Sequence, residues 1–203
     1  LHLGSALSGL LVLSLPIAIA ATPVWAHLCR RFGKQRVWAA GYAGAGLASL
    51  AFLAIKPGPL AGVAFGAALL VLNAMIVVEP TASAAVLADI VDYGRWRFRA
   101  DHGGTYFALF GMVTKVNVGI GAAIGLSVAG LFGFDARAAT QSAGGLFGLM
   151  LAISLMPALC YAVSIAMILR FPINQHRQQA IVRAIARRES RLQRAAAPAA
   201  PET

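Results

Sequence analysis

Charged residues are scarce in this sequence, and acidic residues are the scarcest of all. Only seven of its 203 residues are Asp or Glu, and Asp, Glu, Lys and Arg together make up 12%. Hydrophobic residues make up 59%, and the mean hydropathy is +0.75. A soluble domain of this length cannot bury so much apolar surface in one core. The composition therefore indicates an integral membrane protein.

Residues that build metal centres and catalytic nucleophiles are also few. Cys29 is expected on the reducing side of the membrane and Cys160 within a span, so we expect no disulfide. The histidines are scattered over loops and chain ends, at His2, His27, His102 and His176. No spacing matches a zinc site, a phosphate-binding glycine loop or a nucleophile elbow. We therefore expect no metal site and no cofactor.

Positive charge is concentrated in short clusters between apolar runs. The net charge is +10, but this clustering argues for orientation in the bilayer and against a nucleic-acid partner. Of 17 Lys and Arg residues, four lie in 27–36, three in 95–99 and seven from 170 onward. The opposite side would hold Lys56 and Arg137. By the positive-inside rule, the basic clusters and the C-terminus are expected in the cytoplasm.

Five apolar runs predict an all-α transmembrane domain over residues 1–172. A helix needs about 20 residues to cross about 30 Å of hydrocarbon. The expected spans are 3–26, 37–55, 60–88, 106–134 and 143–169. The first run lacks the basic start of a signal peptide, so a span is the favoured interpretation. The third run is too long for a straight span and should tilt, protrude or break at Pro80.

Residues 173–203 are expected to form a basic cytoplasmic tail with a disordered end. Its apolar and basic positions suit a helix lying on anionic lipid. A solvated tail that serves only as an orientation signal is the alternative.

Two ionisable residues lie inside the expected spans. A charge near the bilayer centre costs about 2.5 to 3.5 kcal/mol on insertion scales. Lys115 lies about 14 Å along its helix from Tyr106, and Gly111 and Gly119 stand one turn away on the same face. We therefore expect Lys115 to face a cavity, with a structural ion pair as the alternative. Glu79 either lines the same transport path or makes a hydrogen bond in the packed bundle.

Most of the remaining charges lie between residues 89 and 101. Two carboxylates one helical turn apart precede three arginines and a third carboxylate: Asp89, Asp92, Arg95, Arg97, Arg99 and Asp101. Three such carboxylates could bind Mg²⁺ in a membrane-embedded transferase. The arginines would neutralise them, however, so an ionic gate on the cytoplasmic side is the favoured interpretation.

Two segments resemble a known transporter family. The run ADIVDYGRWRFRADHGGTYFALFGMVTK at 88–115 resembles the loop between helices ten and eleven of the glycoside-pentoside-hexuronide:cation symporters. These form the melibiose permease group of the major facilitator superfamily. The run PVWAHLCRRFGKQR at 23–36 resembles their loop between helices eight and nine. The resemblance implies that the five spans are helices 8–12 of a twelve-helix transporter whose N-terminal half is missing here.

The resemblance also implies a function and residue roles. It implies symport of a glycoside or related solute with Na⁺ or H⁺ by alternating access in a bacterial inner membrane. Lys115 matches the lysine that faces the central cavity. The inner gate and the loop that braces it match Asp89, Asp92, Arg95, Arg97, Asp101, Arg30, Arg31 and Arg36. Arg95 stands where melibiose permease has an acidic residue and Asp101 near a basic position, so the charge pairs are expected to differ.

Two alternatives to a symporter stay open at this point. One is the Mg²⁺-dependent transferase built on Asp89 and Asp92. The other is an inactive transporter remnant or membrane scaffold, because five spans would leave Glu79 and Lys115 without the partners expected from the other half.

Overall fold

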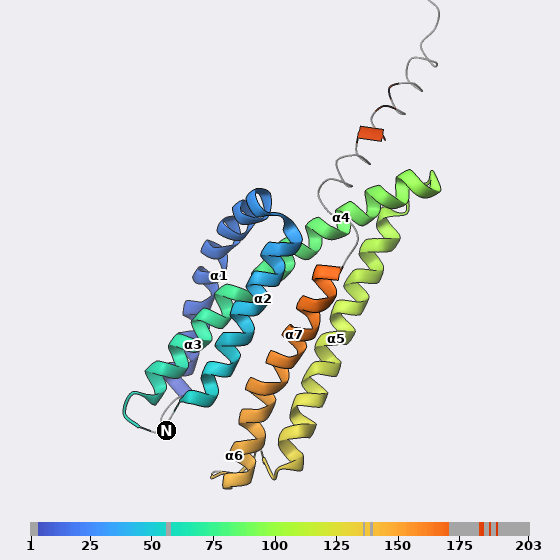
Figure 1. Ribbon diagram of the computed structural model, residues 1–203. Helices are drawn as coiled ribbons and strands as arrows, with labels where there is room; N and C mark the ends of the chain where they lie inside the picture. The colour runs from blue at the N-terminus through green and yellow to red at the C-terminus, as the bar shows by residue number, and fades with distance from the viewer. Residues whose placement is uncertain are drawn as a thin grey trace, which may run out of the picture.

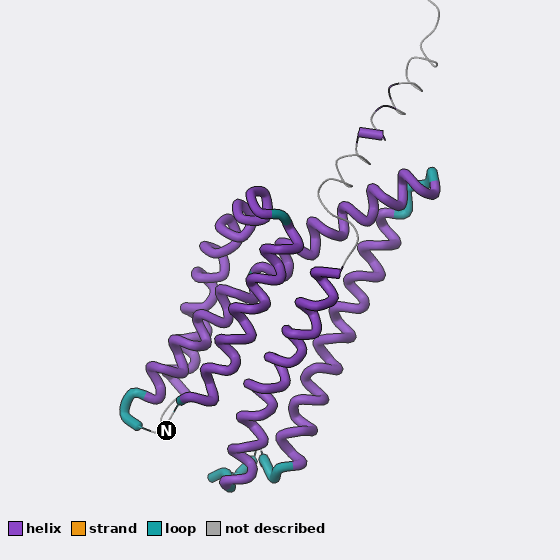
Figure 2. Tube along the Cα trace, in the orientation of Figure 1, coloured by secondary structure: helices purple, strands orange, loops and turns teal. Residues whose placement is uncertain are grey.

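The computed structural model describes residues 4–55, 58–135, 137–138 and 140–170, and residues 183, 184, 187 and 190 of the tail. Within these residues the chain is helical, without strands, and short loops join the helices (Figure 2). The helices are α1 (Gly4–Phe32), α2 (Lys34–Ala51), α3 (Ala61–Ile76), α4 (Val78–Phe98), α5 (Gly103–Leu131), α6 (Ala143–Met150) and α7 (Met156–Arg170). A 3₁₀ turn, η1 (Phe52–Ala54), extends α2, and a π turn, η2 (Leu151–Leu155), joins α6 to α7.

Four helical segments of the described chain are long and apolar enough to cross a membrane. They are Lys34–Ala54, Ala61–Phe98, Gly103–Leu131 and Ala143–Arg170. These confirm an all-α membrane protein. The span expected at 3–26 lies in α1, which is not among the four, so the count of five stays a prediction. The tail expected at 173–203 lies outside the described residues, apart from the four positions given above.

The third span differs from its predicted bounds of 60–88. Its helical residues run from Ala61 to Phe98, which corresponds to about 57 Å at helical rise and exceeds the hydrocarbon core. The helix therefore extends ten residues beyond the predicted end of the span, in keeping with the expected protrusion. The helix breaks at Val77 and not at Pro80. A proline obstructs the turn before it, because its ring meets the carbonyl four residues back and it donates no hydrogen bond.

Helix α2 lies at the centre of the fold. It packs against α1, α3, α4 and α7, while α5 lies beyond α7 and α4 extends across to the start of α5 (Figure 1). The face of α2 toward these neighbours is rich in small residues, and Ala45 and Ser49 are fully buried. Small side chains let helices approach closely, which is how helices associate where lipid supplies no hydrophobic drive.

Helices α2 and α4 lie tightly against each other at Gly41. A Cβ atom added to Gly41 would lie 2.4 Å from Cγ1 of Val78, the first residue after the break. Val78 is fully buried and β-branched, so it has no room to turn away. Gly41 therefore fixes how closely the two helices can pack.

Replacing Gly41 with alanine is expected to destabilise the protein by about 1 to 3 kcal/mol, the typical cost of overpacking a filled core. Gly119→Ala is the matched control, because nothing lies within 4 Å of a Cβ atom at Gly119. The control should be neutral or slightly stabilising, since alanine favours helices over glycine by about 1 kcal/mol. Thermal unfolding of both purified variants in one detergent measures the difference, and equal melting temperatures would contradict the close contact.

Candidate functional site

The basic residues near the α1–α2 turn, the α4–α5 turn and the end of α7 lie at one end of the bundle, which we call the basic end. Its best-defined polar contact joins α2 to α4. The Lys34 ammonium donates to both carboxylate oxygens of Asp89, at 2.7 and 2.8 Å, and to the carbonyl of Ala85 at 3.1 Å. The Asp89 side chain is only 10% exposed and that of Lys34 25%, so water screens this pair weakly. Helix α4 is thereby held to the start of α2.

A glycine turn positions Lys34. Gly33 is the single residue between α1 and α2, and its φ of 94° lies in the region that glycine adopts without strain. The turn lets α2 begin at Lys34, so the ammonium projects from the first turn toward α4. We expected the nearby arginines to neutralise Asp89, and this is wrong, because Lys34 does so. Nothing local in the sequence distinguishes Lys34 from its basic neighbours.

A second charge pair closes the turn between α4 and α5. Arg95 pairs with Asp101, and Asp101 also accepts a hydrogen bond from the backbone N–H of Gly103 at 2.9 Å. Between them Arg99 ends α4 in the left-handed conformation, with φ of 59°. The charges of Arg95 and Asp101 are the ones expected to depart from the family pattern, and they pair with each other.

This turn yields a prediction for pH. The Arg95 guanidinium and then the Gly103 N–H hold the pKa of Asp101 below its ordinary value. The ionised Asp101 carboxylate stabilises the turn fully at pH values above the ordinary Asp pKa of about 3.9. This stabilisation is lost as the pH falls through the lowered pKa of the folded protein. Arg95→Gln should raise the titration midpoint of Asp101 toward the ordinary pKa of an aspartate. The titration of the Gly103 amide resonance in detergent measures it, with the exposed neighbour Arg97→Gln as control. An unchanged midpoint in Arg95→Gln would contradict the pairing.

The other expected gate residues do not join these two pairs. Arg30, Arg36 and Arg97 are exposed, and Asp92 is half-buried. Arg31 is also exposed and lies over the ring of Phe32, 5.3 Å from its centroid. The basic end thus holds two separate pairs and several exposed cations. Whether any of these residues acts as a gate stays a prediction.

The two ionisable residues of the spans lie on different helices with different surroundings. Glu79 is half-buried in α4 and lies near Tyr42 of the α2 core. Tyr42 in turn packs against Tyr161 of α7, with ring centroids 5.1 Å apart. Lys115 of α5 is exposed. Glu79 and Lys115 therefore do not contact each other in the described chain. A transport path that both residues line stays a prediction.

Lys115 stands on an uncovered part of α5. This helix packs against α4 near its start and against α6 and η2 toward its end. Every residue between 112 and 124 is exposed. No atom lies within 4 Å of a Cβ atom built at Gly111 or Gly119, as expected for an uncovered stretch, so the room that these glycines leave in a cavity stays a prediction. Lys115 makes no ion pair with any residue that the structure describes.

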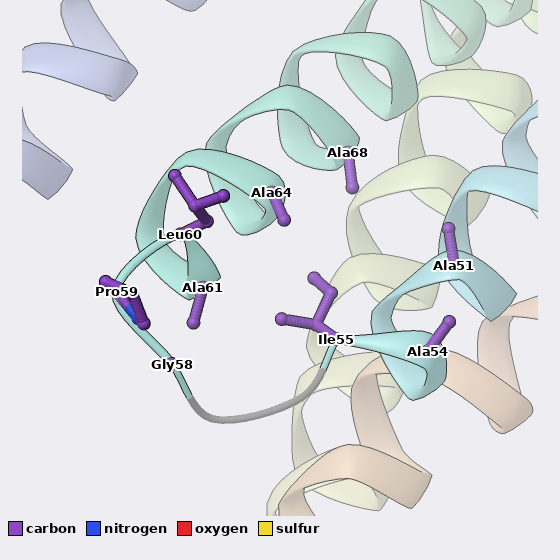
Figure 3. A pocket seen from close by; sticks show the side chains of 9 residues that line it. All are labelled: Ala51, Ala54, Ile55, Gly58, Pro59, Leu60, Ala61, Ala64 and Ala68. Atoms are coloured by element: carbon purple, nitrogen blue, oxygen red, sulfur yellow. The ribbon is translucent and has the colours of Figure 1, made fainter.

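The cavity at the opposite end of the bundle does not suit a polar solute. It has a volume of about 440 Å³ and lies between the end of α2 and the start of α3 (Figure 3). Its lining side chains are apolar, among them Ile55, Ala61 and Ala64. A sugar needs hydrogen-bonding groups placed around it, which these side chains cannot supply.

The carboxylates do not gather into the magnesium site considered above. Asp89 is engaged by Lys34, and Asp101 by Arg95. Among the described residues no group of three or more Asp, Glu, His or Cys side chains lies close enough to hold a metal ion. The transferase interpretation therefore loses the arrangement on which it depended.

Comparison with known proteins gives one match. A family model described as MFS/sugar transport protein matches residues 3–175. The searches of curated proteins and of solved structures return no match. The matched family consists of transporters and not of enzymes, which also argues against the transferase. Since the match covers most of the chain, the protein belongs to the MFS/sugar transport family of the major facilitator superfamily.

Proposed function

We propose that this chain forms the C-terminal part of a symporter that carries a glycoside or related sugar-like solute together with Na⁺ or H⁺. Membership of a sugar-transport family supports the solute class. The observation that carries the proposal is Lys115, an ammonium on an uncovered face of a helix long enough to span a membrane.

Lipid is a poor environment for that ammonium. Exposure to hydrocarbon near the bilayer centre would cost about 2.5 to 3.5 kcal/mol, so a polar surface should cover this face of α5. Helices outside this chain would supply that surface and enclose a cavity between the two parts. In transporters built from two such parts, the solute binds near the midplane and the parts rock about it. Lys115 would then hydrogen-bond the solute or pair with carboxylates across the cavity.

The basic end would form the cytoplasmic side. Its exposed arginines support this orientation through the positive-inside rule. The membrane would be a bacterial inner membrane. The Lys34–Asp89 and Arg95–Asp101 pairs lie at this end, where the path would open inward. Alternating access would break and re-form such contacts in each cycle.

Uptake by membrane vesicles tests the proposal. The polypeptide that carries this chain is first sized in its native membrane, and labelled methyl glycosides are then offered under an imposed Na⁺ or H⁺ gradient. We expect accumulation above equilibrium with one of the two gradients and its collapse when an ionophore removes that gradient. Equilibration that ignores both gradients would contradict symport, and no uptake of any glycoside would contradict the solute class.

A further inference from the structure

The third span consists of two helices that join at Val77, and the α3 side of this joint is held firmly. The indole N–H of Trp25 in α1 donates a hydrogen bond to the carbonyl of Ala74 at 2.8 Å. One residue further, Met75 packs tightly against α2, because a Cβ atom added to Gly44 would lie 2.8 Å from its sulfur. The last turn of α3 is therefore fixed to both α1 and α2.

The α4 side of the joint is suited to bending. Pro80 has no N–H, so the carbonyl of Ile76 receives no backbone hydrogen bond from the residue four positions on. The Thr81 hydroxyl bonds back to the carbonyl of Val77 at 3.2 Å, a contact that often bends helices. Val78 is fully buried against α2 and holds the start of α4 in place. Helix α4 can therefore turn about Val78 while α3 stays still.

The far part of α4 is held to α2 by one ion pair. Asp89 lies about 16 Å along the helix from Val78 at helical rise, and it pairs with Lys34 at the start of α2. The other pair of the described chain, Arg95 with Asp101, lies within the α4–α5 turn, so it moves with α4. Among the ion pairs of the described residues, Lys34–Asp89 alone therefore opposes a swing of α4 away from α2.

A buried thiol lies under α4. Cys29 of α1 is 6% exposed and belongs to one buried cluster with Val37 of α2 and with Val78 and Ala82 of α4. Burial raises the pKa of the Cys29 thiol, and the Lys34 ammonium lowers it in part. A buried thiol in its neutral form reacts slowly with alkylating reagents. The reaction rate of Cys29 therefore reports whether α4 has moved away.

We propose that α4 is a lever that opens the basic end by pivoting at Val78, and that the Lys34–Asp89 pair is its latch. The α3 half of the span stays fixed to α1 and α2 during this movement. The lever rests on the proposed function, since only a transporter has to open at this end. Bending of one span in this way differs from the rocking of two rigid parts, in which the angle between α3 and α4 does not change.

Alkylation of Cys29 tests the lever in membrane vesicles that hold the full polypeptide. N-ethylmaleimide is the probe, and Cys29→Ala gives the background from every other thiol. Asp89→Asn should raise the alkylation rate about tenfold or more, because the charged hydrogen bonds of the latch stabilise only the closed form. Pro80→Ala should lower the rate, because it restores the backbone donor at the pivot. Asp92→Asn is the matched control for the lost charge, since Asp92 makes no ion pair in the described chain.

A second control separates opening from a general loss of stability. Gly145→Ala strains the α5–α6 end, where an added Cβ atom would lie 2.8 Å from the carbonyl oxygen of Gly133, and it leaves α4 unchanged. We expect the Cys29 alkylation rate of this variant to stay near that of the unchanged protein.

Three results would overturn the proposal. Equally fast alkylation in Gly145→Ala and Asp89→Asn, compared at the same drop in melting temperature, would mean general unfolding. An unchanged rate in Asp89→Asn would mean that the ion pair is no latch. An unchanged rate in Pro80→Ala would mean that the span does not bend at this joint. The labelling needs neither solute nor ion gradient, so failure of the lever and failure of symport are seen separately.

Discussion

Lys115→Ala should lower gradient-driven uptake about tenfold or more and leave the fold intact. A hydrogen bond from a charged group contributes about 1.5 to 3 kcal/mol, so its loss at the solute should lower uptake by about tenfold or more. The described chain gives Lys115 no ion-pair partner, so the bundle loses no contact. The paired measurement is initial uptake rate and melting temperature in the full transporter.

Two further variants sharpen this experiment. Lys115→Arg keeps the charge but changes its shape and should retain part of the uptake. Val113→Ala is the control, because Val113 is 55% exposed and lies two residues away, on the opposite side of α5. Normal uptake by Lys115→Ala would exclude the cavity role. A marked fall in melting temperature together with the loss of uptake would favour the structural ion pair instead.

The second large effect is expected at Asp89. Asp89→Asn leaves the Lys34 ammonium without its counter-charge in a site that is three-quarters shielded from solvent. Breaking a buried pair costs about 3 to 5 kcal/mol, and the partial exposure of Lys34 lowers our expectation to about 2 to 3 kcal/mol. Unfolding of the purified protein in detergent measures it. Asp92→Asn is the matched control, since Asp92 lies one turn along α4 and makes no ion pair in the described chain.

A double-mutant cycle separates the pair from its surroundings. Lys34→Met with Asp89→Leu removes both charges and should recover most of the stability that either single change loses, because no buried charge stays unpaired. Additive losses in the double variant would show that the two side chains stabilise the fold independently and would contradict the geometry described above.

The sequence predicts the spans far better than it predicts their ends. Apolar runs mark where a helix can lie in lipid, so four of the expected segments are present with shifted bounds. They do not mark where a helix stops once it has left the membrane. The third span was expected to end at residue 88, yet residues 89–98 continue α4 to Phe98, because charged side chains are compatible with a helix in water.

The candidate site is less predictable, because its contacts join distant residues. Asp89 and Lys34 are separated by 55 positions, and sequence spacing within one helix carries no information about such a contact. Local spacing places Gly111 and Gly119 on the helical face of Lys115, but what covers that face depends on helices outside this chain, so the expected cavity stays a prediction. It could not show that Glu79 lies toward Tyr42 in the packed core, because that depends on how α4 is rotated against α2.

The single-residue connection at Gly33 has a mechanical consequence. Phe32 ends α1 and Lys34 begins α2, so the connection is too short to lengthen or shorten. Any sliding of α1 along its own axis must therefore pull directly on the first turn of α2 and on the Lys34 side chain carried there. A displacement at one end of α1 would thus be transmitted across the basic end to α4 without a flexible loop to absorb it.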